Sequence, residues 1–360
     1  MKPKQRIFTL LTIVLAATLS ACSGGATIAT SWPGILANDK HVYLAYNQHV
    51  YAIDLATGLE VWRYPAEADS KKAFFAAPSL TADGQLIVGG YDNTLYSLNR
   101  DTGAVIWSFS EATDRYIGSS LVFEENIFAP NADRNLFALD TQGKLLWSFE
   151  SQSAQWTKPA VNPECKCIYL PSMDHSIYSI DAQTGRLKWM TEDLGGAIVG
   201  TPAHDSREVL YSGTFASEVL AVDARNGAVL WRTPTDGWVW GGPVLADDTL
   251  YFGDLNGVLY AVNSQTGEII WRIQADGRIP DSPLVTQETI YFNTENGSLY
   301  AVGKDGNFVW PEAKLIGGKL YSAPVLAGDT ILVATVGSEQ LLYALDLNGL
   351  QKWTFVPREK

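Results

Sequence analysis

The chain repeats one pattern along almost its entire length, and this constrains the fold more than any other feature. Eight copies end in a tryptophan, and successive tryptophans lie 39 to 45 residues apart. Each of these tryptophans follows a glycine by four residues. The pairs are Gly58 and Trp62, Gly103 and Trp107, Gly143 and Trp147, Gly185 and Trp189, Gly227 and Trp231, Gly267 and Trp271, Gly306 and Trp310, and Gly349 and Trp353. A repeat of this period indicates one supersecondary unit used eight times.

Each unit contains four short strand patterns separated by turn residues. In the sixth unit the strands are expected over 242–245, 249–252, 258–262 and 269–272, which predicts a four-stranded antiparallel meander. No stretch has sustained helical periodicity, so the class is all-β. A sheet of roughly 42 residues cannot bury both faces alone, whereas sheets packed around an axis can. The sequence therefore predicts an eight-bladed β-propeller of four-stranded antiparallel blades over residues 31–360.

Ring closure is left open by the repeat. The first unit begins with its innermost strand near Ser31, and the eighth ends with its outermost strand near Trp353. Each blade is then continuous in sequence. We expect the first and last blades to pack face to face, unless residues 26–30 add a strand to the ring.

The first 21 residues have the pattern of an export signal. A basic stretch from Lys2 to Arg6 precedes an apolar run from Ile7 to Leu19, which is too short to span a bilayer stably. The run ends in Leu19-Ser20-Ala21-Cys22, which resembles the lipobox of bacterial lipoproteins. We predict a signal peptide over 1–21, a lipidated Cys22 and a lipid-anchored linker over 22–30. The alternative is an ordinary signal cleavage site near Cys22.

Charge narrows the class of partner. The chain has 26 Lys and Arg against 39 Asp and Glu, a formal net charge of −13. Such a surface repels phosphate backbones and anionic lipid headgroups. We therefore expect no nucleic-acid partner, and membrane attachment through the lipid anchor alone.

The run from Ala52 to Trp62 resembles the tryptophan-docking repeat of quinoprotein (PQQ-type) propellers. Among families with this repeat, an eight-bladed lipoprotein with nothing added most resembles the BamB family of outer-membrane assembly lipoproteins. That resemblance implies a non-catalytic scaffold that holds an envelope protein, such as a β-barrel assembly protein. It also implies location at the outer membrane, on the periplasmic side, because Ser23 rather than Asp follows Cys22. In a host without an outer membrane, the location would be the external face of the cytoplasmic membrane.

The alternative function is a PQQ-dependent oxidoreductase or a small-ligand sensor. The resemblance to quinoprotein enzymes implies Ca²⁺ ligands, a general-base Asp and two adjacent cysteines. Here Cys165 and Cys167 are separated by Lys166. None of the four histidines falls in a recognisable nucleophile or metal motif, although His175 lies beside Asp174. We therefore expect no catalytic, cofactor-binding or metal-binding residues, and we keep PQQ with calcium as the alternative.

Cys165 and Cys167 fall in a predicted hairpin turn of the fourth unit. In an exported protein two nearby thiols can form a disulfide or serve as metal ligands. No further Cys or local His completes a four-ligand zinc set, so we favour a pair that staples the turn or is merely tolerated there.

Aromatic residues recur where one unit passes to the next, three residues before the proline that opens the innermost strand. These connections should circle one mouth of the central channel, together with acid-bearing loops between second and third strands. The predicted interaction face consists of Phe75, Tyr116, Trp156, Trp238, Trp240 and Tyr321. Aromatic side chains are enriched at the centres of protein interfaces. The alternative is that they pack between neighbouring blades and hardly reach solvent.

Overall fold

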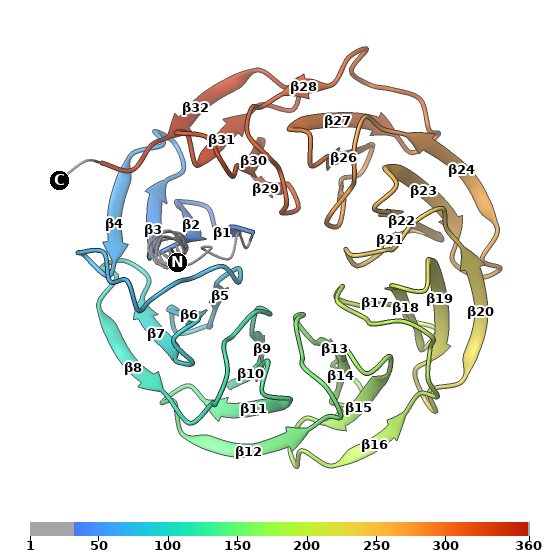
Figure 1. The fold of residues 1–360 in the computed structure, drawn as a ribbon, viewed down its shortest axis with the longest axis horizontal. Helices are drawn as coiled ribbons and strands as arrows, with labels where there is room; N and C mark the ends of the chain where they lie inside the picture. The colour runs from blue at the N-terminus through green and yellow to red at the C-terminus, as the bar shows by residue number, and fades with distance from the viewer. Residues whose placement is uncertain (1–31, 359–360) are drawn as a thin grey trace, which may run out of the picture. The chain divides into compact units, whose positions relative to one another are not determined.

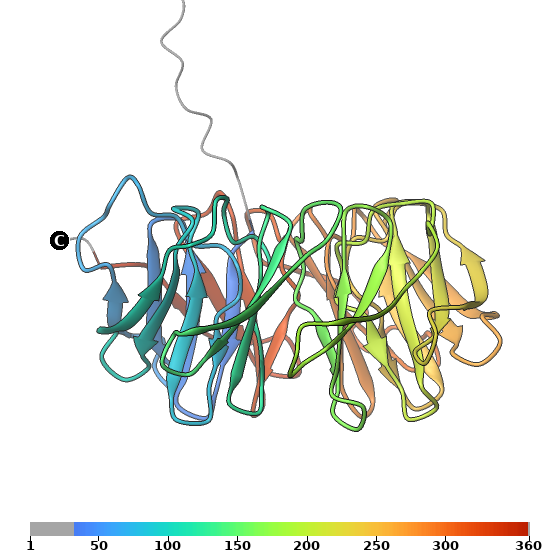
Figure 2. The ribbon, with the colours of Figure 1, turned by 90° about the horizontal axis from the view of Figure 1, so that it is seen from below.

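A computed structural model of the chain describes residues 32–358. The predicted signal peptide, the linker, Cys22 and Ser31 lie outside the described residues. The described chain forms eight four-stranded antiparallel sheets, each built from four consecutive strands, and Figures 1 and 2 show them arranged as a ring. The predicted eight-bladed β-propeller is confirmed.

Within each blade the first strand lies nearest the channel and the fourth lies at the periphery (Figure 1). Blades one to four consist of β1 (Gly34–Ala37), β2 (His41–Tyr46), β3 (His49–Asp54), β4 (Glu60–Tyr64); β5 (Ser79–Leu80), β6 (Gln85–Gly89), β7 (Leu95–Asn99), β8 (Val105–Phe109); β9 (Leu121–Phe123), β10 (Asn126–Pro130), β11 (Asn135–Asp140), β12 (Leu145–Glu150); β13 (Ala160–Asn162), β14 (Cys167–Pro171), β15 (Ile177–Asp181) and β16 (Leu187–Met190). Blades five to eight consist of β17 (Ala203–His204), β18 (Val209–Thr214), β19 (Glu218–Asp223), β20 (Val229–Pro234); β21 (Val244–Ala246), β22 (Thr249–Gly253), β23 (Val258–Asn263), β24 (Ile269–Gln274); β25 (Leu284–Val285), β26 (Thr289–Asn293), β27 (Ser298–Gly303), β28 (Lys314–Leu315); β29 (Val325–Ala327), β30 (Thr330–Ala334), β31 (Leu342–Leu345) and β32 (Gln351–Phe355).

The repeated Gly and Trp join neighbouring blades. The Trp62 ring lies on Gly103 of the next blade, where an added Cβ would come within 2.5 Å of the indole. Gly103 has φ +71°, a left-handed conformation that residues with a Cβ rarely adopt. The Trp62 indole N–H donates to the Arg100 carbonyl at 3.0 Å. Equivalent indole bonds to the next blade are made by Trp107, Trp147, Trp189, Trp231, Trp271 and, back to blade one, Trp353.

Blade seven departs from this pattern. Its outer strand β28 is only two residues long, and Trp310 lies before it rather than within it. Pro311 directly follows Trp310 and has no N–H to donate to the strand ladder. Trp310 is buried against Tyr291 and Leu345. Among residues 32–358, its indole N–H has no acceptor.

The hydrophobic cores lie between blades, and one of them closes the ring. Ile53 and Leu44 of blade one pack with Leu332, Ala344 and Phe355 of blade eight. The two blades remain separate sheets, so within the described chain closure relies on face packing, as expected; residues 26–30 lie outside this part. The Ser322 hydroxyl also donates to the Pro33 carbonyl across the junction.

Residues 32–358 consist of strands, turns and loops and contain no helix. No membrane-crossing helix is therefore found in this part of the chain.

Candidate functional site at the channel mouth

One face of the propeller combines two kinds of segment. In blades two to eight, the connection that enters the blade and the loop between its second and third strands are joined by a backbone hydrogen bond. In blade five, for example, the Phe215 N–H donates to the Ala197 carbonyl at 3.0 Å, and in blade six the Leu255 N–H donates to the Trp238 carbonyl at 2.9 Å. The same bond links Tyr91 to Ala73, Ala132 to Arg115, Met173 to Ala154, and Glu295 to Arg278. The expectation that both segments share a face is confirmed, and we call this face the mouth face.

Five aromatic rings form a continuous cluster on the mouth face. Trp32, directly before β1, lies 5.2 Å from Trp240 and 6.0 Å from Tyr321 between ring centroids. Phe215, just after β18, lies 5.1 Å from Trp240 and stacks on Trp238 at 5.0 Å. The cluster therefore links segments of blades one, five, six and eight. Trp238 is 50% exposed, and the other four rings are half-buried. We call these five residues the aromatic cluster.

The structure divides the predicted interaction residues. Trp238, Trp240 and Tyr321 belong to the aromatic cluster, and Trp156 is half-buried on the connection that enters blade four.

Phe75 and Tyr116 are corrections to the predicted face, because both are buried. Phe75 contacts the Tyr91 ring at 4.9 Å, and Tyr116 is a member of the core between blades two and three. Burial also raises the pKa of the Tyr116 hydroxyl. Tyr116 thus packs between two blades, Phe75 packs against a loop of the blade that it enters, and neither is available to a partner.

Sequence reasoning missed Phe215 and did not place Trp32 in the predicted face. Phe215 lies in a loop between a second and a third strand, where only acids were considered. The signal that could have found it is that the equivalent loop position is also apolar in other units, with Tyr91, Met173, Leu255 and Val336.

Several acids of the mouth-face loops are engaged in local bonds. Asp254 is fully buried. It accepts hydrogen bonds from the N–H groups of Gly237, Asn256 and Val258 and from the Tyr260 hydroxyl. Asp174 likewise accepts from backbone N–H groups of its blade's entering connection. The prediction that loop acids line the mouth is therefore wrong at Asp254, because the loop uses that carboxylate to satisfy its own backbone N–H groups.

Glu295 lies beside the cluster and is paired. Its Oε1 lies 2.7 Å from Lys319 Nζ and accepts from the Tyr321 hydroxyl at 3.3 Å. The bond from Lys319 lowers the pKa of the Glu295 carboxyl. The charge next to Tyr321 is therefore held in place by an ion pair.

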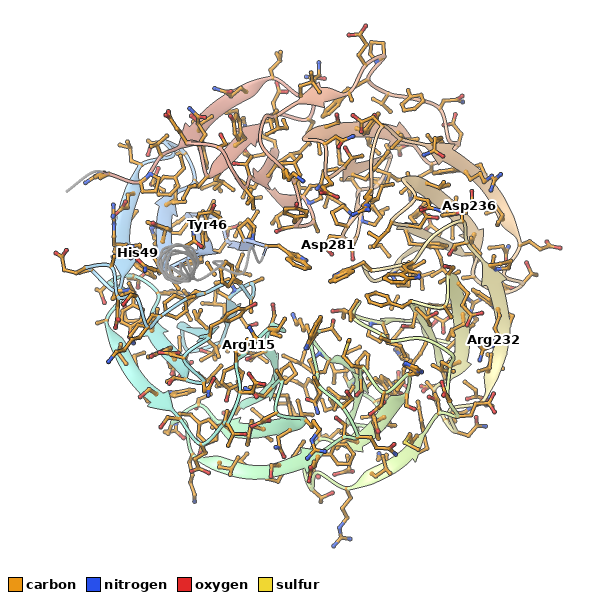
Figure 3. All side chains as sticks on the ribbon, in the orientation of Figure 1. Tyr46, His49, Arg115, Arg232, Asp236 and Asp281 are labelled. Atoms are coloured by element: carbon orange, nitrogen blue, oxygen red, sulfur yellow. A yellow bond between two sulfur atoms is a disulfide. The ribbon has the colours of Figure 1, made fainter. Side chains whose placement is uncertain are left out.

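A further carboxyl lies at the inner rim of the ring, where Figure 3 labels Asp281. Asp281 accepts hydrogen bonds from the Ser282 N–H at 2.7 Å and from the Ala323 N–H of the next blade at 2.8 Å. The surrounding protein shields this carboxyl from water, and this desolvation raises its pKa. Asp281 thus joins the entries of blades seven and eight.

The mouth face offers aromatic surface for binding. Among residues 32–358, no group of three or more His, Cys, Asp and Glu side chains could hold a metal ion. The His175 ring, which is next to Asp174 in sequence, instead pairs with exposed Asp193 at 3.1 Å. Large aromatic surface near the channel is suited to stacking and packing contacts.

The predicted cysteine pair is joined in a disulfide, Cys165–Cys167. It joins the turn after β13 to the first residue of β14. This turn connects a first to a second strand and is therefore on the face opposite the mouth face.

Eight Trp-docked, four-stranded blades around a channel define a PQQ-like β-propeller. Residues 23–209 and 215–317 match the family described as "Outer membrane protein assembly factor BamB". The chain belongs to this BamB family.

Individual relatives are distant. BamB of Shewanella oneidensis is 25% identical over 230 residues, which cover 60% of this chain and 56% of that protein. Quinohemoprotein alcohol dehydrogenase ADH IIB of Pseudomonas putida is 24% identical over 246 residues, covering 56% of this chain and 34% of the enzyme. The chain spans between 10% and 56% of the length of the curated relatives it matches.

The crystal structure of BamB from Moraxella catarrhalis superimposes with a TM-score of 0.71 at 17% identity, covering 84% of this chain and 92% of that one. This likeness concerns the fold alone.

Proposed function

We propose that the protein is a non-catalytic scaffold of the cell envelope that holds a protein partner at its mouth face. The observation that carries the proposal is the aromatic cluster. Membership of the BamB family supports an envelope partner, and we propose a β-barrel assembly protein. Attachment would be through lipidated Cys22 to the periplasmic side of the outer membrane, or to the external face of the cytoplasmic membrane where a host lacks an outer membrane.

The chemistry of the cluster favours a protein partner. Aromatic side chains provide large contact area at small entropic cost and dominate the centres of many interfaces. Trp238 is the accessible end of the cluster, and its ring is held by stacking on Phe215. A partner would therefore meet a preformed surface and would lose little free energy in ordering it.

The test is crosslinking in the native envelope with a photoreactive residue at position 238, followed by mass spectrometry. We expect a β-barrel assembly protein in the crosslinked product. In parallel, Trp238→Ala should reduce recovery of that partner by about tenfold or more, as for a truncated interface anchor. Leu230→Ala is the matched control. Leu230 is similarly exposed, at 52%, but lies at the start of β20, the end of the strand that is away from the mouth face.

Unchanged partner recovery with Trp238→Ala, in a variant that keeps the wild-type unfolding midpoint, would contradict the proposed face. Absence of any protein crosslink from position 238 would contradict the scaffold function itself.

The second candidate is a quinone-dependent oxidoreductase or small-ligand sensor, favoured by the similarity to the Pseudomonas putida enzyme. Residues 32–358 do not fit a calcium–quinone centre, since no acidic cluster that could hold the ion comes together there. The Cys165–Cys167 pair also lies away from the channel mouth. Incubation with PQQ and Ca²⁺ tests this candidate: a tightly bound chromophore with dye reduction would support it, and no bound chromophore would remove its enzyme form.

A further inference from the structure

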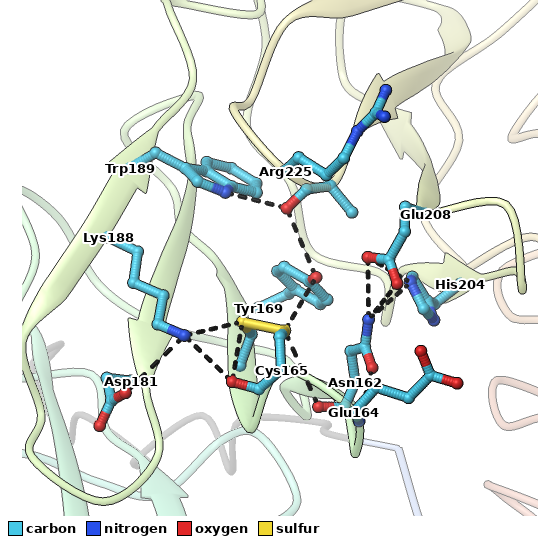
Figure 4. Close-up of a disulfide and its surroundings, with 12 residues drawn as sticks. Asn162, Glu164, Cys165, Tyr169, Asp181, Lys188, Trp189, His204, Glu208 and Arg225 are labelled. Atoms are coloured by element: carbon cyan, nitrogen blue, oxygen red, sulfur yellow. Dashed lines mark hydrogen bonds and ion pairs between the residues drawn. A yellow bond between two sulfur atoms is a disulfide. The ribbon is translucent and has the colours of Figure 1, made fainter.

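The disulfide on the face opposite the mouth face has an asymmetric environment. Cys167 opens β14 and is only 4% exposed, whereas Cys165 lies in the preceding turn and is half-buried. Figure 4 shows the pair between β16 and the side chains of Tyr169 and Asn162. An incoming group therefore reaches Cys165 more readily than Cys167.

A lysine is aimed at the buried sulfur. Lys188 Nζ lies 3.2 Å from Cys167 Sγ and 3.0 Å from the Cys165 carbonyl oxygen, as the dashed lines in Figure 4 show. Its acidic neighbour Asp181 is farther away, at 3.7 Å. The ammonium group is thus closer to sulfur than to the carboxylate.

The position of this lysine is unusual within the repeat. Lys188 directly precedes the docking Trp189, and six of the other seven units have an aliphatic residue there: Val61, Ile106, Leu146, Leu230, Ile270 and Val309. Lys352 occupies the position in unit eight, and its Nζ pairs with Asp329 at 2.7 Å. The cation and the cysteine pair therefore occur together in unit four.

We propose that Cys165–Cys167 is a redox-active disulfide that exchanges with a thiol reductant of the envelope. A thiolate attacks Cys165 Sγ and forms a new S–S bond there, while the Cys165–Cys167 bond breaks. The bonding electron pair leaves on Cys167 Sγ as a thiolate beside the Lys188 ammonium. A second thiol then releases Cys165, so that two thiols are oxidised to one disulfide and the protein gains two electrons and two protons.

Two physical arguments support exchange over a purely structural staple. A disulfide constrains the unfolded chain less as the loop it closes becomes shorter, and this pair is only two residues apart. A buried thiolate is costly without a countercharge, and a neighbouring cation makes a thiolate a better leaving group. Lys188 is placed to supply that cation.

The experiment measures reduction of the full chain, purified from the envelope in detergent, by glutathione. Alkylation and mass spectrometry of the peptide that contains both cysteines give the rate, and tryptophan fluorescence reports that the protein stays folded. We expect reduction of the folded protein. Lys188→Met should slow it on the order of tenfold, given the usual effect of an opposite charge on a thiol and of thiol acidity on exchange.

Two variants are controls. Lys352→Met removes the same charge at the equivalent position of blade eight and should reduce at the wild-type rate. Lys188→Arg keeps the cation and should restore most of the rate, which separates a role in exchange from a role in folding.

Rapid acid quenching should trap glutathione on Cys165. Reduction that requires unfolding by urea, equal rates for Lys188→Met and Lys352→Met, or an adduct confined to Cys167 would each overturn the proposal. None of these outcomes depends on a partner at the mouth face.

Discussion

Substitution of a docking glycine offers the sharpest test of how the blades are joined. Gly185 has φ +68°, and a Cβ added there would lie 2.6 Å from Cδ2 of the Trp147 indole in the preceding blade. Gly185→Ala therefore introduces two costs. The left-handed conformation costs a residue with a Cβ about 1–2 kcal/mol, and displacement of the packed ring costs about 1–3 kcal/mol.

The displaced ring also loses its 3.2 Å hydrogen bond to the Ala182 carbonyl. Such a bond contributes about 1 kcal/mol. We expect Gly185→Ala to lower the free energy of unfolding by about 3–6 kcal/mol in total.

Gly328→Ala is the matched control. Gly328 also has a positive φ, of +59°, but no atom lies within 4 Å of the added Cβ. Gly328→Ala should therefore lower the free energy of unfolding only by the cost of the left-handed conformation, about 1–2 kcal/mol. Restriction of the unfolded chain by alanine offsets about 0.4–1 kcal/mol in both variants and cancels in the comparison.

The assay is urea unfolding, monitored by tryptophan fluorescence and by circular dichroism, with coincident transitions required before free energies are compared. If Gly185→Ala and Gly328→Ala lowered the free energy of unfolding by amounts within about 0.5 kcal/mol of each other, the result would refute the docking argument, since a difference of that size is ordinary scatter. In a Trp147→Ala background, Gly185→Ala should fall to the cost of the control.

Three further predictions follow from single contacts. Trp310→Phe should lower the free energy of unfolding by about 1–2 kcal/mol less than Trp271→Phe does, as measured by urea unfolding. Trp271→Phe removes the 2.9 Å bond to the Lys304 carbonyl, whereas the Trp310 N–H has no acceptor among residues 32–358. Equal losses of unfolding free energy would contradict this. Asp254→Asn should destabilise by about 1–3 kcal/mol, because one amide cannot replace four accepted bonds at a buried carboxylate, and an unchanged unfolding midpoint would show that the loop does not need the charge. The pKa of Glu295 is lowered in the folded protein, chiefly by Lys319, so this pair stabilises the fold above the ordinary glutamate pKa and loses its effect as pH falls through the folded value. Thermal unfolding of Lys319→Met should therefore differ from wild type at pH 7 and converge with it at low pH, and a constant difference across the range would contradict the assignment.

The fold was predictable because each unit contains its own local signals. The Gly four residues before each Trp predicts a left-handed turn, and Gly103 and Gly185 adopt it. The departure of blade seven also had a local signal, since Pro311 follows Trp310 and interrupts the outer strand. That signal is a single residue, and it is easily overlooked because the Gly and Trp of the seventh unit still align with those of the other units.

The site was less predictable because equivalent positions in the repeat do not share one environment. Tyr116 and Trp240 align with each other, yet Tyr116 lies in a core between blades and Trp240 contacts Trp32. Which way such a side chain turns depends on contacts across the channel and with the next blade. The pairing of Trp32 with Trp240 joins residues some 200 positions apart, and no local pattern specifies it.

Within residues 32–358 the ring closes without a shared sheet, so the closing junction is of the same kind as the junctions between consecutive blades. The junction between blades eight and one relies on side-chain packing and on the bond from the Trp353 indole to the Leu55 carbonyl. Six other junctions are built in the same way, and among residues 32–358 only Trp310, between blades seven and eight, lacks the indole bond. In the described part of the chain, no strand pairing joins the two blades. The order of blades along the chain is therefore separable from the architecture, and a version of the propeller that started at another blade, with the present first and last blades joined by a short linker, would retain every interface described above.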